Sequence, residues 1–319
     1  MLRSIEIFLK RTYHSGKPLL LGFSGGHDSR VLLELLIESR KKRPFTLLVA
    51  HVDHGWREES RLEAFELKEM VERRGLPFFL HTLKKPEDKR NLEDLCREER
   101  YAFFQRIYRE NDCGALLLGH HADDQAETVL KRLFEGAHFT AFGAMQCVGA
   151  FRGMSVWRPL LEWARQDILA YLREKGLEAL DDRTNADPAF LRARMRSGLV
   201  PDLEAAFGKN FRGNMTDLAE TFQEIGSYFL EKSRPYLATK EVFDGGVSLD
   251  FTGAPAGSLL EMEVALRFFF LEEGVMLGAR HLRQLARQLA YRDSNKKLRV
   301  RNRLFVADQG KLFCFRDYL

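Results

Sequence analysis

The feature that most constrains the fold is a glycine-containing loop between a short apolar strand and a helix. The apolar run Leu19–Phe23 leads into Ser24-Gly25-Gly26-His27-Asp28-Ser29, after which leucine and valine recur at helical spacing. Paired glycines before a helix N-terminus suit an anion, because the backbone approaches closely and the free N–H groups of the first turn point at the ligand. We therefore expect phosphate binding. Ser24 and Ser29 would add hydroxyl donors, and Asp28 would either cap the helix or hold a divalent cation.

The loop does not have the spacing of the common nucleotide-binding motifs. It matches neither G-x-x-x-x-G-K-[ST] nor G-x-G-x-x-G. Turns and N-caps often contain Gly-Gly and Asp-Ser for local reasons, but all six residues in this strand–loop–helix context favour a phosphate site. The sequence therefore indicates another way of holding ATP.

Length and composition favour an ordinary globular protein. At 319 residues the chain is long enough for two domains. We find no apolar run of the roughly 18 residues that span a bilayer, and Met1–Lys10 alternates charged and apolar residues without a signal-peptide core. We expect a cytoplasmic protein with no membrane partner. The scattered cysteines, without a C-x-x-C pair, predict neither a metal cluster nor a disulfide framework; they are Cys96, Cys113, Cys147 and Cys314.

The first two thirds of the chain alternate between strand and helix patterns. The predicted strands are 19–23, 46–50, 77–83 and 115–119, and the predicted helices between and after them are 31–36, 58–74, 91–110 and 122–134. This alternation predicts a parallel sheet covered on both faces. Ligands bind beyond the carboxyl ends of such strands, where the loops after Phe23, Ala50 and Leu118 fall.

The rest of the chain predicts a helical connection and a smaller domain. We interpret 139–157 as a loop with short elements, either facing a substrate or simply connecting, and 165–175 as a helix. The predicted domains are 1–207, a helical linker 208–235, and a small α+β domain 236–319. That domain is expected to contain helices at 261–271 and 281–291 and a hairpin pairing 297–306 with 311–315.

A second motif, Gly119 to Thr128, lies at the end of the fourth predicted strand. Residues three or four apart share a helix face, so Asp124 and Glu127 project together. With Asp28 they would form an all-oxygen site suited to Mg²⁺. His120 would then contact phosphate or transfer a proton. A zinc site that also uses His51 and His54 is the competing interpretation.

Basic residues gather in a third segment, from Arg183 to Arg212. Arg192, Arg194 and Arg196 cannot all face one side of a helix, so only some of them can enter a site. The guanidinium fork suits phosphate recognition, although a solvated basic helix would show the same pattern.

Together these motifs resemble the tRNA(Ile)-lysidine synthetase family of the PP-loop ATP pyrophosphatases. The resemblance covers about residues 19 to 203. The segments that carry it are 24–29, His51-Val52-Asp53-His54-Gly55, 97–104, 119–128, Arg158-Pro159-Leu160-Leu161 and 184–201. It implies an α/β fold with a parallel-sheet, Rossmann-like domain of the adenine nucleotide alpha hydrolase type, followed by a small α+β domain.

The resemblance also implies an activity and a set of site residues. ATP would activate C2 of the wobble cytidine of isoleucine tRNA with a CAU anticodon, and L-lysine would then displace AMP. Implied ATP-binding residues are Ser24, Gly25, Gly26, His27, Asp28, Ser29, Ala50, His51, Val52 and Gly119. Implied Mg²⁺ ligands are Asp28, Asp124 and Glu127; implied catalytic residues are His120, Asp124 and Arg192; implied tRNA-binding residues are Arg183, Arg194 and Arg196.

The chain departs from the family pattern at a few positions. Ala193 replaces a usual Asn, Phe190 a usual Tyr and Trp56 a usual Leu, and Arg30 stands where an apolar residue is common. The short C-terminal third fits members with one appended domain. The alternatives are a PP-loop tRNA thiolating enzyme, an amidating or ligating enzyme acting on a small molecule, and a non-catalytic nucleotide or RNA binder. The oligomeric state is left open, a homodimer included.

Overall fold

The computed structural model describes residues 1–53, 55, 58–83, 92–180, 191–208, 210–253, 259–300 and 303–315. Its internal contacts divide the chain into two compact units. The first combines Met1–Thr128 with Met145–Thr216, and the second combines Val129–Ala144 with Asp217–Leu319. Helices α5 (Ala122–Phe134) and α9 (Phe211–Leu237) each pass from one unit into the other. The sequence-based domain bounds stay a prediction.

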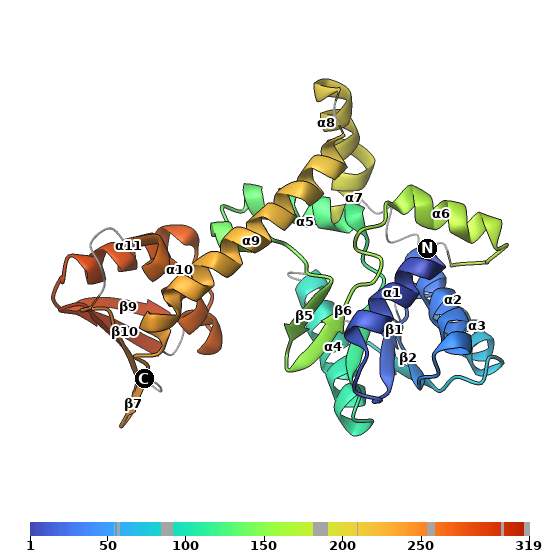
Figure 1. The fold of residues 1–319 in the computed structure, drawn as a ribbon, viewed down its shortest axis with the longest axis horizontal. Helices are drawn as coiled ribbons and strands as arrows, with labels where there is room; N and C mark the ends of the chain where they lie inside the picture. Colours follow the sequence, from blue (N-terminus) through green and yellow to red (C-terminus); the bar gives the residue numbers. More distant parts are fainter. Residues whose placement is uncertain are drawn as a thin grey trace. The chain divides into compact units, whose positions relative to one another are not determined.

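The first unit is built on a mainly parallel sheet of order β3-β2-β1-β4-β6-β5. Figure 1 labels β1, β2, β5 and β6 of this sheet. The strands are β1 (Leu19–Gly22), β2 (Leu47–Asp53), β3 (Phe78–Thr82), β4 (Ala115–Leu118), β5 (Val148–Phe151) and β6 (Met154–Trp157). The helices are α1 (Leu2–Thr12), α2 (His27–Lys42), α3 (Glu58–Glu72), α4 (Leu92–Glu110), α6 (Arg165–Glu174), α7 (Leu191–Arg194) and α8 (Val200–Phe207), with a π-helical turn at Met195–Leu199.

The central strands β1, β2 and β4 are buried on both faces, which explains why they begin as continuous apolar runs. Successive side chains alternate between faces. Leu19 and Leu21 enter one core with residues of α1, α2, α3 and α6, whereas Leu20 enters a second core with Phe103 and Phe104 of α4. The predicted parallel sheet, its first four strands and its helices are therefore confirmed.

The segment 139–157, predicted as a loop with short elements, contains three of them. The 3-10 helix Phe139–Ala141 comes first, and β5 and β6 then form an antiparallel hairpin in which β6 also pairs in parallel with β4. Arg152 and Gly153 make its two-residue turn, both with positive φ (+51° and +74°). Each strand has only four residues, too few for a clear period-2 signal.

The second unit contains a five-stranded antiparallel sheet of order β7-β8-β11-β10-β9. Its strands are β7 (Glu241–Phe243), β8 (Gly246–Asp250), β9 (Lys296–Val300), β10 (Arg303–Asp308) and β11 (Lys311–Phe315), and α10 (Leu259–Glu272) and α11 (Ala279–Ala290) contribute to the same core. The β10–β11 hairpin is as predicted, but 297–306 contains parts of two strands, and the β7–β8 hairpin was missed. Across the described ranges, no helix is long and apolar enough to cross a membrane.

Candidate active site

The Ser24–Ser29 loop folds as a compact turn at the carboxyl end of β1. Gly25 has φ +83°, and a Cβ there would lie 2.7 Å from the Leu67 side chain, so both conformation and space require glycine. The Ser29 hydroxyl is 3.0 Å from the Ser24 hydroxyl and donates to the Gly26 carbonyl at 3.0 Å. Gly26 is the N-cap of α2 and gives it no side-chain cap, and Asp28 lies inside the first turn. Asp28 is therefore not the helix cap.

A second glycine brings the other motif against this loop. Strands β1 and β4 are neighbours, with Gly22 opposite Leu118. A Cβ at Gly119, the next residue, would be 3.1 Å from both the Asp28 carbonyl carbon and the Ser29 nitrogen. The chain leaving β4 therefore runs directly over the first turn of α2, an approach that a side chain would obstruct. This contact places the start of α5 beside Asp28.

His121 lies at the centre of the acidic residues that meet there. The side chain is 1% exposed, and its Nε2 is 3.7 Å from Asp28 Oδ2 and 3.5 Å from Asp124 Oδ2. Its Nδ1 is 3.6 Å from Asp123 Oδ2. Burial lowers the pKa of His121, but the neighbouring carboxylates outweigh burial and raise that pKa above its ordinary value. The carboxylates thus favour the protonated form of His121.

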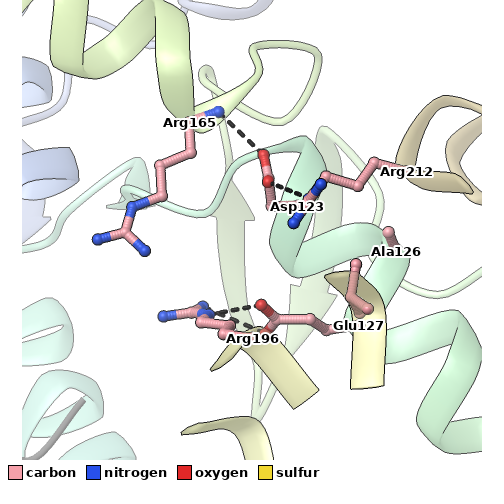
Figure 2. A pocket seen from close by; sticks show the side chains of 7 residues that line it. Asp123, Ala126, Glu127, Arg165, Arg196 and Arg212 are labelled. Atoms are coloured by element: carbon pink, nitrogen blue, oxygen red, sulfur yellow. Dashed lines mark hydrogen bonds and ion pairs between the residues drawn. The ribbon is translucent and has the colours of Figure 1, made fainter. Parts of the chain in front are cut away.

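The three carboxylates predicted as metal ligands lie close together but face different partners. Burial raises the pKa of Asp28, whose buried Oδ1 has no hydrogen-bond partner among the described residues. Asp124 and Glu127 instead bind Arg196 from the π-helical turn, with Nη2 2.5 Å from Asp124 Oδ1 and Nε 2.5 Å from Glu127 Oε1. Figure 2 shows the Arg196–Glu127 pair. Arg196, which the sequence assigned to tRNA, therefore contacts the predicted metal ligands.

His120 is buried where both Asp124 and a group of arginines act on its charge. Burial lowers its pKa to about 3, and Arg158, Arg192 and Arg97 lower that pKa further against the effect of Asp124. The imidazole is therefore neutral near pH 7. Its buried Nδ1 lacks a hydrogen-bond partner within the described ranges. A neutral imidazole can donate one N–H to a phosphate oxygen, but it does not bring a positive charge.

The main chain of β2 offers polar groups beyond the end of β1. Phe23 N donates to Ala50 O at 2.8 Å, so the Ala50 carbonyl faces β1. Orientation alternates along a strand, so the Val52 backbone faces the same side, where β1 has already ended. His51 Nδ1 lies 2.8 Å from the Phe23 carbonyl, and burial lowers the pKa of this histidine. His51 thus fixes the turn between β1 and the loop.

A cavity of about 90 Å³ lies beside this cluster and exposes residues that the sequence did not suggest. Its charged lining is drawn in Figure 2: Asp123, Glu127, Arg165, Arg196 and Arg212. Arg212 pairs with Asp123 at 2.8 Å, and the Arg165 backbone N–H donates to the same carboxylate at 2.9 Å. In Figure 2 the Arg165 guanidinium makes no hydrogen bond or ion pair with the other residues drawn, and its positive charge lowers the pKa of Asp28. The sequence signal for Arg165 was its place at the start of a predicted helix, soon after Arg158-Pro159-Leu160-Leu161.

The remaining predicted residues are spread around the site. His27 and Arg192 are half-buried and Arg194 is exposed. Arg30 is buried, donating to the Glu178 carbonyl and pairing with Glu34 at 3.0 Å, so its charge is compensated inside the fold. Ala193 is buried as well. Arg183, His54, Phe190 and Trp56 lie outside the described residues.

The donor set fits magnesium, although the present arrangement does not yet enclose a metal ion. Asp28, Asp124 and Glu127 offer only oxygen ligands, which Mg²⁺ prefers, and the Oδ1 atom of Asp28 is buried without a partner in the described chain. Among the described residues, no three His, Cys, Asp or Glu side chains already surround one point as metal ligands. A rearrangement at Arg196 would therefore have to accompany metal binding.

Comparison with known proteins agrees with this architecture. A model of the PP-loop domain matches residues 1–203. The tRNA(Ile)-lysidine synthase of Protochlamydia amoebophila (strain UWE25) is 35% identical over 320 residues, covering 98% of this chain and 68% of that protein. The enzyme of the same name from Chlamydia muridarum (strain MoPn / Nigg) is 37% identical over 308 residues, covering 94% of this chain and 92% of the relative.

The chain belongs to the tRNA(Ile)-lysidine synthase family. This confirms the family resemblance and the predicted fold class. Among solved structures, the U34-tRNA thiolase NcsA from Methanococcus maripaludis, determined with its 4Fe-4S cluster, aligns with a TM-score of 0.57 and 20% identity, covering 70% of this chain and 77% of that chain. At this identity the likeness shows a shared fold and nothing about chemistry.

Proposed function

We propose that this tRNA(Ile)-lysidine synthase family member uses ATP to join L-lysine to C2 of the wobble cytidine in isoleucine tRNA with a CAU anticodon. ATP would adenylate the base with release of pyrophosphate, and the lysine amine would then displace AMP. The change would redirect decoding from AUG to AUA. The reaction forms a carbon–nitrogen bond, so the protein would be a ligase that acts on tRNA in the cytoplasm.

The observation that carries this proposal is the close approach of the Gly119–Thr128 motif to the Ser24–Ser29 loop. The close approach of Gly119 to Asp28 brings the Ser24–Ser29 loop and the acidic residues at the start of α5 close together at the end of the parallel sheet. A plain nucleotide binder would not need buried carboxylates in this position, because each one costs free energy unless it is compensated. The family's named relatives supply the choice of RNA and amino acid.

Each group has a proposed role in that site. The Ser24–Ser29 loop and the first turn of α2 would bind the ATP phosphates, and the Val52 backbone would recognise adenine. Mg²⁺, held by Asp28, Asp124 and Glu127, would neutralise phosphate charge. Neutral His120 would donate a hydrogen bond, and Arg192 would stabilise the charge that develops at the α-phosphate, where fixed donors contribute most.

We further propose that Arg165 contacts the pyrophosphate portion of ATP. Its charge reaches Asp28 of the loop, and Figure 2 shows its guanidinium on the cavity side away from Arg212. A guanidinium binds phosphate oxygens through two parallel hydrogen bonds. Arg183 and Arg194 stay proposed tRNA contacts.

The test is lysine transfer to RNA by the whole protein. Purified protein is incubated with ATP, Mg²⁺, labelled lysine and an unmodified isoleucine tRNA transcript, and the label in RNA is counted. We expect incorporation, its loss in Asp28→Asn, and its absence with a transcript carrying uridine at the wobble position. A folded, ATP-binding protein that transfers no lysine to the cytidine transcript would contradict the proposal.

Thiolation of tRNA is the second candidate, which the sequence left open. Sulfur transfer needs reactive cysteines, and a thiolate forms poorly in an apolar core. Burial raises the pKa of Cys113 to about 11 and also raises the pKa of Cys96. Cys314 is buried on β11 in the second unit. We therefore expect Cys147→Ser to leave activity unchanged, whereas a sulfur-transfer enzyme that uses this cysteine would lose its activity.

A further inference from the structure

The guanidinium of Arg196 is bound at the same oxygens that are proposed to hold a metal ion. Its Nε is 2.5 Å from Glu127 Oε1, and its Nη2 is 2.5 Å from Asp124 Oδ1 and 3.2 Å from Glu127 Oε2. The carboxylate side chains are only 4% and 8% exposed, whereas Arg196 is 26% exposed. Arg196 thus reaches the pair from the side nearer to solvent.

The Arg196 guanidinium compensates the negative charges of Asp124 and Glu127. Asp124 and Glu127 lie three residues apart on one face of α5, and two nearly buried negative charges are costly when nothing compensates them. His121 approaches Asp124 from the other side, through Oδ2, and is not within ion-pair distance of Glu127. Without Arg196, Glu127 would lose the ion pair that the structure records for it.

The backbone that carries Arg196 is also unusual. Arg196 lies in the π-helical turn Met195–Leu199, between α7 and α8. Such turns are rare, interrupt regular α-helical packing and often occur at functional sites. The guanidinium is thus carried by a turn whose backbone departs from the regular α-helical path.

We propose that Arg196 is a positioning residue that acts as an exchangeable counter-cation: it holds Asp124 and Glu127 in place until a divalent cation takes over the same oxygens. This inference rests on the proposed metal role of those carboxylates. Mg²⁺ and the guanidinium are both positively charged and would use the same oxygens, so they compete for Asp124 Oδ1 and Glu127 Oε1. Arg196 release and metal binding are then one coupled event.

The coupling predicts that removing the Arg196 guanidinium strengthens metal binding. If Arg196 instead supported the metal site, removing it would weaken metal binding. The test measures free Mn²⁺ by electron paramagnetic resonance during titration of the full chain without nucleotide. We expect Arg196→Gln to bind Mn²⁺ at least about tenfold more tightly than the unchanged protein. The charged hydrogen bonds from Arg196 to Asp124 and Glu127 would no longer compete with the metal ion. Arg194→Gln, two residues earlier and exposed, is the matched control and should leave the affinity unchanged.

A second variant and a second readout separate competition from loss of structure. Arg196→Lys keeps the charge without the fork, so its Mn²⁺ affinity should fall between those of the unchanged protein and Arg196→Gln. Mn²⁺ should also raise the melting temperature of Arg196→Gln more than that of the unchanged protein.

Unchanged or weaker Mn²⁺ binding in both Arg196 variants overturns the exchange. If Glu127→Gln also leaves Mn²⁺ binding unaltered, the metal role of the carboxylates fails as well. The lysine-transfer assay then reports separately on whether the proposed reaction survives.

Discussion

The contact made by Gly119 yields the sharpest structural prediction. In Gly119→Ala the new methyl carbon would begin 3.1 Å from the Asp28 carbonyl carbon and the Ser29 nitrogen. Carbon contacts are optimal at about 3.5–4.0 Å, so the first turn of α2 has to retreat by roughly half an ångström. Both atoms belong to the backbone of a helix whose apolar face is buried, so the shift cannot be absorbed by a side chain.

The expected cost is moderate for the fold and larger for activity. Overpacking of this kind costs about 1–3 kcal/mol of stability. Since a 1 Å misplacement can cost about 10²-fold in rate, half of that shift predicts roughly a tenfold loss in kcat/KM and a weaker affinity for ATP.

Thermal unfolding, ATP titration calorimetry and lysine transfer measure the three effects. The control is Gly226→Ala in α9, where a Cβ meets no atom within 4 Å and alanine favours the helix. It should keep full activity with equal or higher stability. A Gly119→Ala protein with unchanged ATP affinity and turnover would refute the claim that this close approach assembles the site.

The other predictions concern single side chains. Arg165→Ala should weaken ATP and inorganic pyrophosphate binding about tenfold but leave AMP binding unchanged; equal losses for all three ligands, or a similar loss in the exposed Arg173→Ala, would contradict its role. Gly25→Ala should lower stability by about 1–3 kcal/mol, and an unchanged melting temperature would refute the strain. Burial lowers the pKa of His138 from 6.5 to about 4. As pH falls, His138 is therefore protonated in the unfolded chain at a higher pH than in the folded protein. The stability that neutral His138 preserves is thus full above about pH 6.5 and declines by up to about 3 kcal/mol toward pH 4; His138→Gln should flatten that slope in urea unfolding.

The parallel sheet could be predicted because its central strands β1, β2 and β4 are buried on both faces. Leu19–Gly22 and Ala115–Leu118 are short apolar runs that end at glycine or at a polar motif, and the helices after them carry clear apolar faces. By contrast, β5 and β7 are partly exposed strands of four and three residues. Their signal was in their turns, Arg152-Gly153 and Asp244-Gly245, where the glycines have φ +74° and +87°.

The members of the site could be predicted better than their partners. Motif spacing indicated Asp28, Asp124 and Glu127, since residues on one helix face and at neighbouring strand ends come together by topology. Arg196 binds both carboxylates of α5, but it lies in a π-helical turn 69 residues after Glu127. Periodicity in sequence does not encode such a contact.

The protonation of the two adjacent histidines shows the same limit. His120 and His121 follow each other in sequence, yet carboxylates raise the pKa of His121 whereas burial lowers that of His120 to about 3. Which neighbour faces which carboxylate is decided by tertiary packing. The sequence therefore indicated a functional pair without showing that packing shifts the two pKa values in opposite directions.

The most direct test of the whole account is a product balance in one reaction. ATP labelled at the α-phosphate, labelled lysine and isoleucine tRNA transcript are mixed with the protein, and AMP, pyrophosphate and RNA-bound lysine are quantified together. We predict equal amounts of the three products and none of them without RNA. Formation of ADP and phosphate, or AMP release without lysine on the RNA, would contradict the claim that the Ser24–Ser29 loop and the carboxylates of α5 form one site for lysine transfer.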